Sequence, residues 1–147
     1  ISLAIAGILV AMAAPYFADY NVNARLREGG NAALSEALYA QGEAIKRNGT
    51  VRLVISGSTL QTTDETPERA DPPDNVLRNR AMPDGVTADA AVTLNFGSNG
   101  RPTPFGTSYV VDLSKSGVTC SGDYRCPSLR VDAGGGIRLC GNKNACS

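Results

Sequence analysis

The chain has 147 residues, enough for one domain with a buried core, and its 14 basic and 14 acidic residues leave no formal net charge. Histidine and tryptophan are both absent, so the commonest general base and metal ligand is missing. This composition argues against a strongly basic nucleic-acid-binding protein, a zinc enzyme and a triad hydrolase. We therefore expect no catalytic residue, no metal site and no cofactor.

The first 14 residues form an apolar segment in which Ser2 is the one polar side chain. A helix needs about 20 apolar residues to span a bilayer, so this segment is too short to do so alone. A buried core helix and a remnant of a signal peptide are the alternative interpretations. Both are disfavoured because the pattern continues through Pro15 into a polar helix without an intervening turn.

A single helix over residues 1–47 would be about 70 Å long, which a domain of this size cannot cover. We therefore expect the first third of the rod to be buried elsewhere, either in a membrane or against copies of the same chain. The side chains expected to make this contact are Ile1, Leu3, Ile5, Ile8, Leu9, Val10, Met12 and Pro15.

Beyond Pro15 the predicted helix becomes amphipathic. Small and apolar residues recur in steps of three and four positions, as on the buried face of a helix. Charged residues, among them Glu36, fall on the remaining surface. The expected buried stripe consists of Leu26, Ala33, Ala37, Ala40 and Ala44.

Three positions predict interruptions of this helix. Asn48 and Gly49 predict its end, because both residues tolerate the left-handed conformation. Pro15 removes one backbone hydrogen bond, so we expect a kink or an unwound stretch there. Gly29 and Gly30 form a second weak point.

The rest of the chain is rich in short runs of β-branched residues separated by turns that contain glycine. Strands are predicted at residues 51–56, 91–96, 108–113, 129–132 and 137–140. Residues 62–86 are rich in proline and acidic residues, and we expect a long surface loop with one short helical turn at 74–80. The chain thus divides into a helix over residues 1–48, which includes the apolar segment 1–14, and a β-rich head over residues 49–147.

Three stretches together resemble the type IV pilin-like proteins. ISLAIAGILVAMAAPYFADY is similar to the apolar half of a pilin helix, with aromatic residues at Tyr16 and Phe17 after the pair Ala14 and Pro15. NARLREGGNAALSEALYAQGEAIKRNGTVRLVI resembles the helix end and first strand of minor pilins of the FimT, FimU and GspH type, and SLRVDAGGGIRLC resembles their closing hairpin. The resemblance implies an α+β fold, with a long N-terminal helix packed on a C-terminal antiparallel β-sheet domain.

The resemblance also implies a function. In that family further residues precede the position of Ile1, and a prepilin peptidase processes the chain. The implied protein is a structural subunit that is held in the inner membrane before the pilus assembly machinery incorporates it, with itself or with other pilins, into an extracellular filament of a Gram-negative-type cell. Adhesion, motility and DNA uptake are its implied surface roles, and a pseudopilin of type II secretion is an alternative. The sequence leaves open whether the subunit is the principal one or a minor one.

The four cysteines all lie in the last fifth of the chain, at positions 120, 126, 140 and 146. An even number without a C-x-x-C pair favours two disulfides and an oxidising compartment over zinc ligands, with four reduced thiols as the alternative. A hairpin centred on Ala133 favours nested bridges that lock residues 120–146, Cys126 with Cys140 and Cys120 with Cys146. Local bridges within 120–126 and within 140–146 are the main alternative, and crossed bridges are disfavoured.

Weak contact with DNA is a second hypothesis. Related competence-type minor pilins carry a Gly-Arg-x-Arg motif in the closing hairpin, but here Gly136 replaces the first arginine before Arg138. From residue 101 onward there are six basic residues against three acidic ones. A non-specific, salt-dependent DNA contact would use Arg130, Arg138 and Lys143, and an ordinary solvated β-surface is the alternative.

Overall fold

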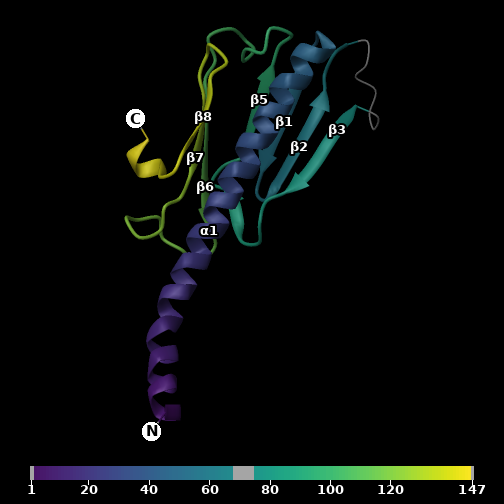
Figure 1. Cartoon of the computed structure of the whole chain (residues 1–147). Coiled ribbons are helices and arrows are strands. Elements are labelled where there is room, and N and C mark those ends of the chain that lie inside the picture. Colours follow the sequence, from purple (N-terminus) through teal and green to yellow (C-terminus); the bar gives the residue numbers. More distant parts are fainter. Residues whose placement is uncertain (1, 68–74, 147) are drawn as a thin grey trace.

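A computed structural model of the chain describes residues 2–67 and 75–146, with the backbone alone for residues 2–6 and 8–15. Within these residues one long helix, α1 (Ser2–Arg47), is followed by eight strands and a short 3-10 helix, η1 (Lys143–Ala145). The C-terminal part of α1 lies against the strands, whereas its N-terminal part extends away from them (Figure 1). This arrangement confirms the predicted α+β fold.

The described strands form two antiparallel sheets of four strands each. The first sheet has the order β3-β2-β1-β5, and the second has the order β4-β6-β7-β8. Helix α1 contacts strands of both sheets, so it closes the core between them. The strands are β1 (Val51–Ser56), β2 (Thr59–Asp64), β3 (Val76–Ala81), β4 (Val86–Ala88), β5 (Val92–Phe96), β6 (Tyr109–Lys115), β7 (Ser128–Val131) and β8 (Ile137–Cys140).

The five predicted strands are confirmed as β1, β5, β6, β7 and β8, but the prediction for residues 62–86 is wrong in part. Strand β2 extends to Asp64, β4 starts at Val86, and the expected helical turn at 74–80 is replaced by β3. Strand β3 pairs with β2 from Thr59 opposite Ala81 to Thr63 opposite Val76. Pairing with β2 therefore overrides the local composition. The proline-rich centre of the expected loop, residues 68–74, lies outside the described residues.

The predicted stripe of α1 is confirmed as the helical side of the core. Leu26, Ala33, Ala37, Ala40 and Ala44 are all fully buried. Four of these five side chains are single methyl groups, so the helix can lie close to the two sheets. The sheets supply the larger side chains of the same core, which are Val51, Leu53, Ile55, Leu60, Leu94, Phe96, Leu113 and Leu129.

The two adjacent glycines of α1 are contact points with the second sheet. A methyl group on Gly29 would lie 2.6 Å from Cγ1 of Val86, and one on Gly30 would lie 3.0 Å from the ring of Pro127. These positions are helical in the structure. The glycines lower the intrinsic helix propensity, but they permit an approach that no other residue allows.

The predicted helix end is confirmed in its geometry. Asn48 has a positive φ of 50°. The amide of Asn48 donates to the carbonyl of Ile45, and the amide of Gly49 donates to the carbonyl of Ala44, both at 3.1 Å. This pair of hydrogen bonds is the Schellman motif. At the other end α1 is helical on both sides of Pro15, so the expected unwound stretch is absent from the described backbone.

Candidate assembly surface

The N-terminal part of α1 projects from the β-domain and leaves apolar side chains in solvent. Tyr16, Phe17 and Tyr20 are 80%, 69% and 70% exposed. The predicted contact residues from Leu3 to Pro15 lie on the same projecting helix (Figure 1), although their side chains, and all of Ile1, are outside the described residues. Among the residues searched, no helix has the length and apolar character needed to cross a membrane.

A loop closed by a disulfide holds α1 at the point where it leaves the domain. The amide nitrogen of Asn23 donates to the carbonyl of Asp123 at 2.9 Å, and its amide oxygen accepts from the backbone of Arg125 at 3.1 Å. The Tyr124 hydroxyl donates to the Asp19 carboxylate at 2.6 Å. That bond raises the pKa of Tyr124, because the neighbouring carboxylate disfavours the phenolate. We call these contacts of Asp19 and Asn23 the helix clamp.

The disulfides are local, so the favoured nested pairing is wrong. Cys120 bonds Cys126, and Cys140 bonds Cys146. The hairpin register explains the error: Cys140 lies opposite Ser128 rather than Cys126. The turn is centred on Gly134, one residue beyond the predicted centre, and a shift of one residue in the turn moves each cross-strand partner by two.

The second disulfide fixes the C-terminal segment beside the first. The backbone amide of Lys143 donates to the carbonyl of Cys126 at 2.7 Å, which joins the two bridged segments. The Lys143 ammonium also pairs with the Asp89 carboxylate, just beyond β4. Burial would raise the pKa of Asp89, but the bonds from Lys143 and Ser114 outweigh it and lower that pKa.

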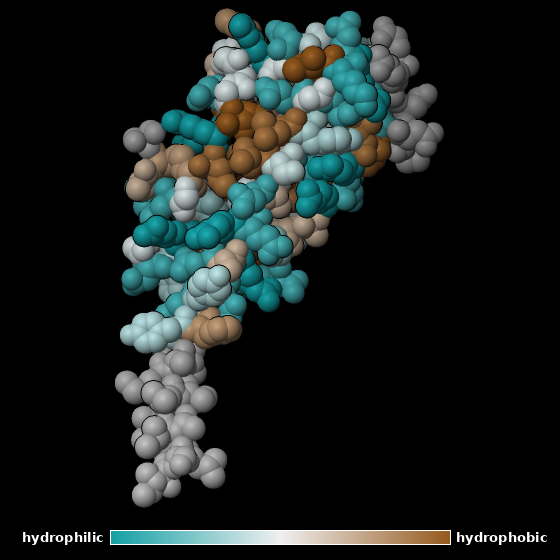
Figure 2. Space-filling model, viewed as in Figure 1, coloured by the Kyte–Doolittle hydropathy of each residue, from teal (hydrophilic) through white to brown (hydrophobic). Residues whose placement is uncertain are grey.

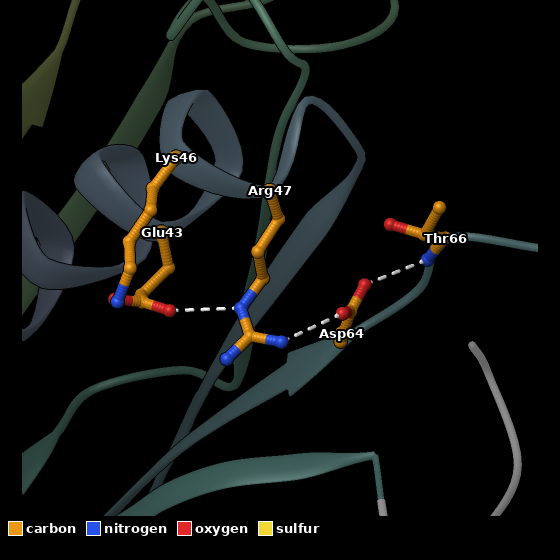
Figure 3. Close-up of polar contacts among 5 residues, drawn as sticks. All are labelled: Glu43, Lys46, Arg47, Asp64 and Thr66. Atoms are coloured by element: carbon orange, nitrogen blue, oxygen red, sulfur yellow. Dashed lines mark hydrogen bonds and ion pairs between the residues drawn. The ribbon is translucent and has the colours of Figure 1, made fainter.

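Charged side chains connect the C-terminal end of α1 to β2 (Figure 3). Arg47 donates from Nε to Glu43 at 2.8 Å and from Nη1 to Asp64 at 3.2 Å. Lys46 pairs with Glu43 at 3.3 Å, and the backbone amide of Thr66 donates to Asp64 at 3.0 Å. The cluster therefore fixes the last turn of the helix against the sheet.

This cluster changes the acidity of its carboxyl groups. The hydrogen bond from Arg47 lowers the pKa of Glu43, against the smaller effect of burial. Burial alone would raise the pKa of Asp64, but the bonds from Thr66 and Arg47 outweigh it, so this pKa is also low. Both carboxylates are thus held in their charged form.

Glu36 is fully buried, so its predicted place on the helix surface is wrong. Its carboxylate accepts from the Thr62 hydroxyl at 2.8 Å and from Arg78 Nε and Nη2, both at 2.9 Å. The guanidinium carbon of Arg78 lies 4.0 Å from the ring centroid of Tyr39. The carboxylate is tolerated in the core because β2 and β3, the strands missing from the sequence prediction, supply its partners.

Comparison with known protein families supports the interpretation of this architecture. The family described as Type II transport protein GspH matches residues 30–136, which is most of the chain. The chain belongs to the GspH family. It is a type IV pilin-like protein of the GspH and FimU type.

Solved structures have the same fold as this GspH-family chain. The minor pilin FimU of Pseudomonas aeruginosa aligns with a TM-score of 0.62 at 19% identity, over 78% of this chain and 87% of FimU. The minor pseudopilin EpsH of Vibrio cholerae aligns with a TM-score of 0.58 at 14% identity, over 80% of this chain and 94% of EpsH. No protein of curated function matches the sequence.

The predicted DNA-contact residues of this GspH-family chain occupy two different places. Arg130 on β7 lies directly opposite Arg138 on β8. Neither makes an ion pair with another described residue, and Nε of Arg130 is buried without a hydrogen-bond partner among them. Lys143 instead lies in η1 and pairs with Asp89. The hairpin therefore brings together two of the three predicted residues.

The helix clamp of this GspH-family chain could not be found by sequence reasoning. Asn23 and Asp19 look like ordinary polar residues of a solvated helix, and their partners lie 100 and 105 positions further along the chain. A partial signal was the closely spaced pair Cys120 and Cys126, which predicts a loop of fixed shape if the local disulfide forms.

Proposed function

We propose that this protein is a structural subunit of a type IV pilus or a type II secretion pseudopilus, and that it assembles through the projecting part of α1. The observation that carries this proposal is the exposure of Tyr16, Phe17 and Tyr20 at the base of an apolar helix. A contiguous exposed apolar surface on a soluble protein is typical of an interaction site. Each large apolar side chain removed from water would contribute about 1.5–3 kcal/mol.

The same apolar helix would hold the subunit in the inner membrane before assembly, together with any residues that precede Ile1. Processing by a prepilin peptidase and incorporation by the assembly machinery belong to this proposal. The β-domain would then form the filament surface in an oxidising compartment, where its two disulfides persist. Adhesion, motility and DNA uptake are the surface roles that such a location permits.

The deciding experiment replaces Ile8 and Leu9 with aspartate in cells that carry the full assembly machinery. Two charges on the apolar helix would need desolvation on burial, so we expect the variant to be absent from sheared filaments. The β-domain should keep its thermal unfolding midpoint, because residues 8 and 9 lie on the projecting helix. Normal amounts of this variant in filaments would refute the proposed function.

Contact with DNA is a second candidate, favoured by the cross-strand pair Arg130 and Arg138. Like charges directly opposite each other on neighbouring strands are destabilising without a counterion, and a phosphate would provide one. A mobility-shift assay with the purified protein at low and at moderate salt tests this function. We expect a shift at low salt that Arg138→Gln weakens and that Arg101→Gln, an exposed control, leaves unchanged. A shift unaffected by Arg138→Gln would remove this candidate.

A further inference from the structure

A second apolar surface lies on the β-domain, along the border between α1 and β8. Figure 2 shows hydrophobic side chains gathered there, between the upper part of the helix and the edge strand. Leu38 is 49% exposed, and Leu34 and Ile137 are partly buried against the core. Leu139 on β8 continues the surface toward the clamp. We call Leu34, Leu38, Ile137 and Leu139 the border patch.

The border patch ends in a hollow of about 480 Å³ between α1 and the disulfide loop. Leu139 lines both the patch and the hollow, so the two surfaces are continuous. The hollow is also lined by Arg27, Arg125 and Pro127. Neither arginine makes an ion pair within the described ranges 2–67 and 75–146. Guanidinium, proline and leucine surfaces together suit aromatic rings, because arginine stacks on aromatic faces.

The chain itself carries a helical segment with the matching chemistry. Tyr16, Phe17 and Tyr20 are exposed on the projecting part of α1, which continues into the apolar segment. Within one molecule, this segment and the border patch lie at different positions along the axis of α1. From Phe17 to Leu34 the rise along the helix is about 25 Å. From Phe17 to Arg27, which lines the hollow, the rise is about 15 Å. A neighbouring subunit displaced by about 15–25 Å along the helix axis would therefore place its aromatic residues beside the hollow and the patch.

We propose that the border patch and its hollow dock the projecting aromatic helix of a neighbouring pilin subunit. Joining two different surfaces in this way is a heterologous contact, which repeats into an open filament rather than a closed dimer. Only Leu38 of the four patch residues is exposed and the other three are partly buried, whereas a stable symmetric dimer buries about 1,200 Å² or more. The contact therefore operates within a filament, where each subunit has several neighbours. This inference rests on the proposed function and adds the surface that receives the helix.

The first test compares two aspartate substitutions at similarly exposed apolar residues. Leu38→Asp lies in the border patch, and Val76→Asp, the matched control, lies on edge strand β3 at 40% exposure. We expect Leu38→Asp to lower the amount of subunit in sheared filaments by about tenfold, because its carboxylate would need desolvation. Val76→Asp should be incorporated like the unmodified chain. Normal incorporation of Leu38→Asp, while the double substitution at Ile8 and Leu9 abolishes incorporation, would overturn this inference and leave the proposed function intact.

The second test identifies the occupant directly and does not depend on how Leu38→Asp folds. A photo-reactive phenylalanine analogue replaces Leu38, and assembled filaments are irradiated before peptide mass spectrometry. We expect a cross-link to the apolar and aromatic helix start of this chain or of another pilin of the same filament. A cross-link to a β-domain, to Leu38 of a second copy, or to a protein without such a helix would contradict the inference. So would filaments that contain the analogue but yield no cross-link between chains.

Discussion

The Tyr124 hydroxyl donates a hydrogen bond to the carboxylate of Asp19 across 105 positions of sequence. With the two bonds of Asn23, it ties a loop closed by Cys120 and Cys126 to the middle of α1. Nearer the N-terminus, Tyr16 and Phe17 are exposed. The clamp is thus the last firm contact before the helix leaves the domain.

Replacing Asn23 with alanine should release the middle of α1. Both bonds of the Asn23 side chain to the loop backbone would be lost, and each is worth about 0.5–1.5 kcal/mol. We expect faster backbone hydrogen exchange in residues 16–27 and little change in residues 33–47, as measured by mass spectrometry of proteolytic peptides. The control Asn31→Ala affects an exposed residue of the same helix and should leave the exchange unchanged. Unaltered protection in Asn23→Ala would show that the clamp does not hold the helix.

Glu36→Ala should destabilise the fold strongly. The change removes a buried carboxylate that satisfies the Thr62 hydroxyl and the Arg78 guanidinium, which is itself partly in contact with solvent. Loss of one partner of such a pair should cost about 2–4 kcal/mol of unfolding free energy, measured by urea denaturation. Glu28→Ala, on the exposed face of α1, is the control and should cost about 0.5 kcal/mol or less. Equal effects of the two substitutions would refute a stabilising role for the buried pair.

Stability should fall as the solution becomes acidic. Glu43 and Asp64 have pKa values below their ordinary values of 4.5 and 3.8. A depressed pKa contributes stability that is fully present above the unfolded-state pKa and lost as the pH falls through the folded-state pKa. We therefore expect the unfolding free energy to be level above about pH 5 and to decline below it.

The contribution of these two carboxyls can be isolated by comparison with the double variant Glu43→Gln and Asp64→Asn. Other acidic groups, such as Asp89, titrate in both proteins, so the difference between the two pH profiles reports on Glu43 and Asp64 alone. We expect the variant to be less stable at neutral pH and to lose less stability on acidification. Parallel profiles would contradict the assignment.

Two glycine-to-alanine substitutions in α1 should have opposite effects. Gly29→Ala would place a methyl group 2.6 Å from the buried side chain of Val86, so the helix or β4 must shift. We expect a loss of about 1–3 kcal/mol. Gly42→Ala has no heavy atom within 4 Å of the new methyl group and should gain about 0.5–1 kcal/mol from helix propensity. Thermal unfolding checks both, and stabilisation by Gly29→Ala would contradict the close packing.

The spacing of apolar residues in the sequence was enough to predict the buried face of α1. The stripe from Leu26 to Ala44 and the helix end at Asn48 were predictable, because helix geometry alone places these residues. Strand β2 was not predictable, because its core-facing residues Thr62 and Asp64 are polar and are typical of an exposed segment. Their partners, Glu36 and Arg47, come from the helix and become visible only once the helix lies on the sheet.

Only one part of the candidate assembly surface could be predicted from the sequence. The projection of the helix start from the domain (Figure 1) follows from composition and length, because a short domain cannot cover a long rod. The disulfide pairing did not follow, because it depends on the exact residue at which the β7–β8 turn is centred. The clamp and the border patch depend on contacts between α1 and residues 121–139, which a pattern in one segment cannot specify.

The position of the clamp also sets a spacing. The described part of the helix rises by about 25 Å from Ser2 to Asp19, and all of this length lies on the far side of the clamp from the β-domain core. A clamp one turn further along the chain would lengthen that stalk by about 5.4 Å. The loop between Cys120 and Cys126 therefore sets the distance between the β-domain and the surface in which the projecting helix is buried.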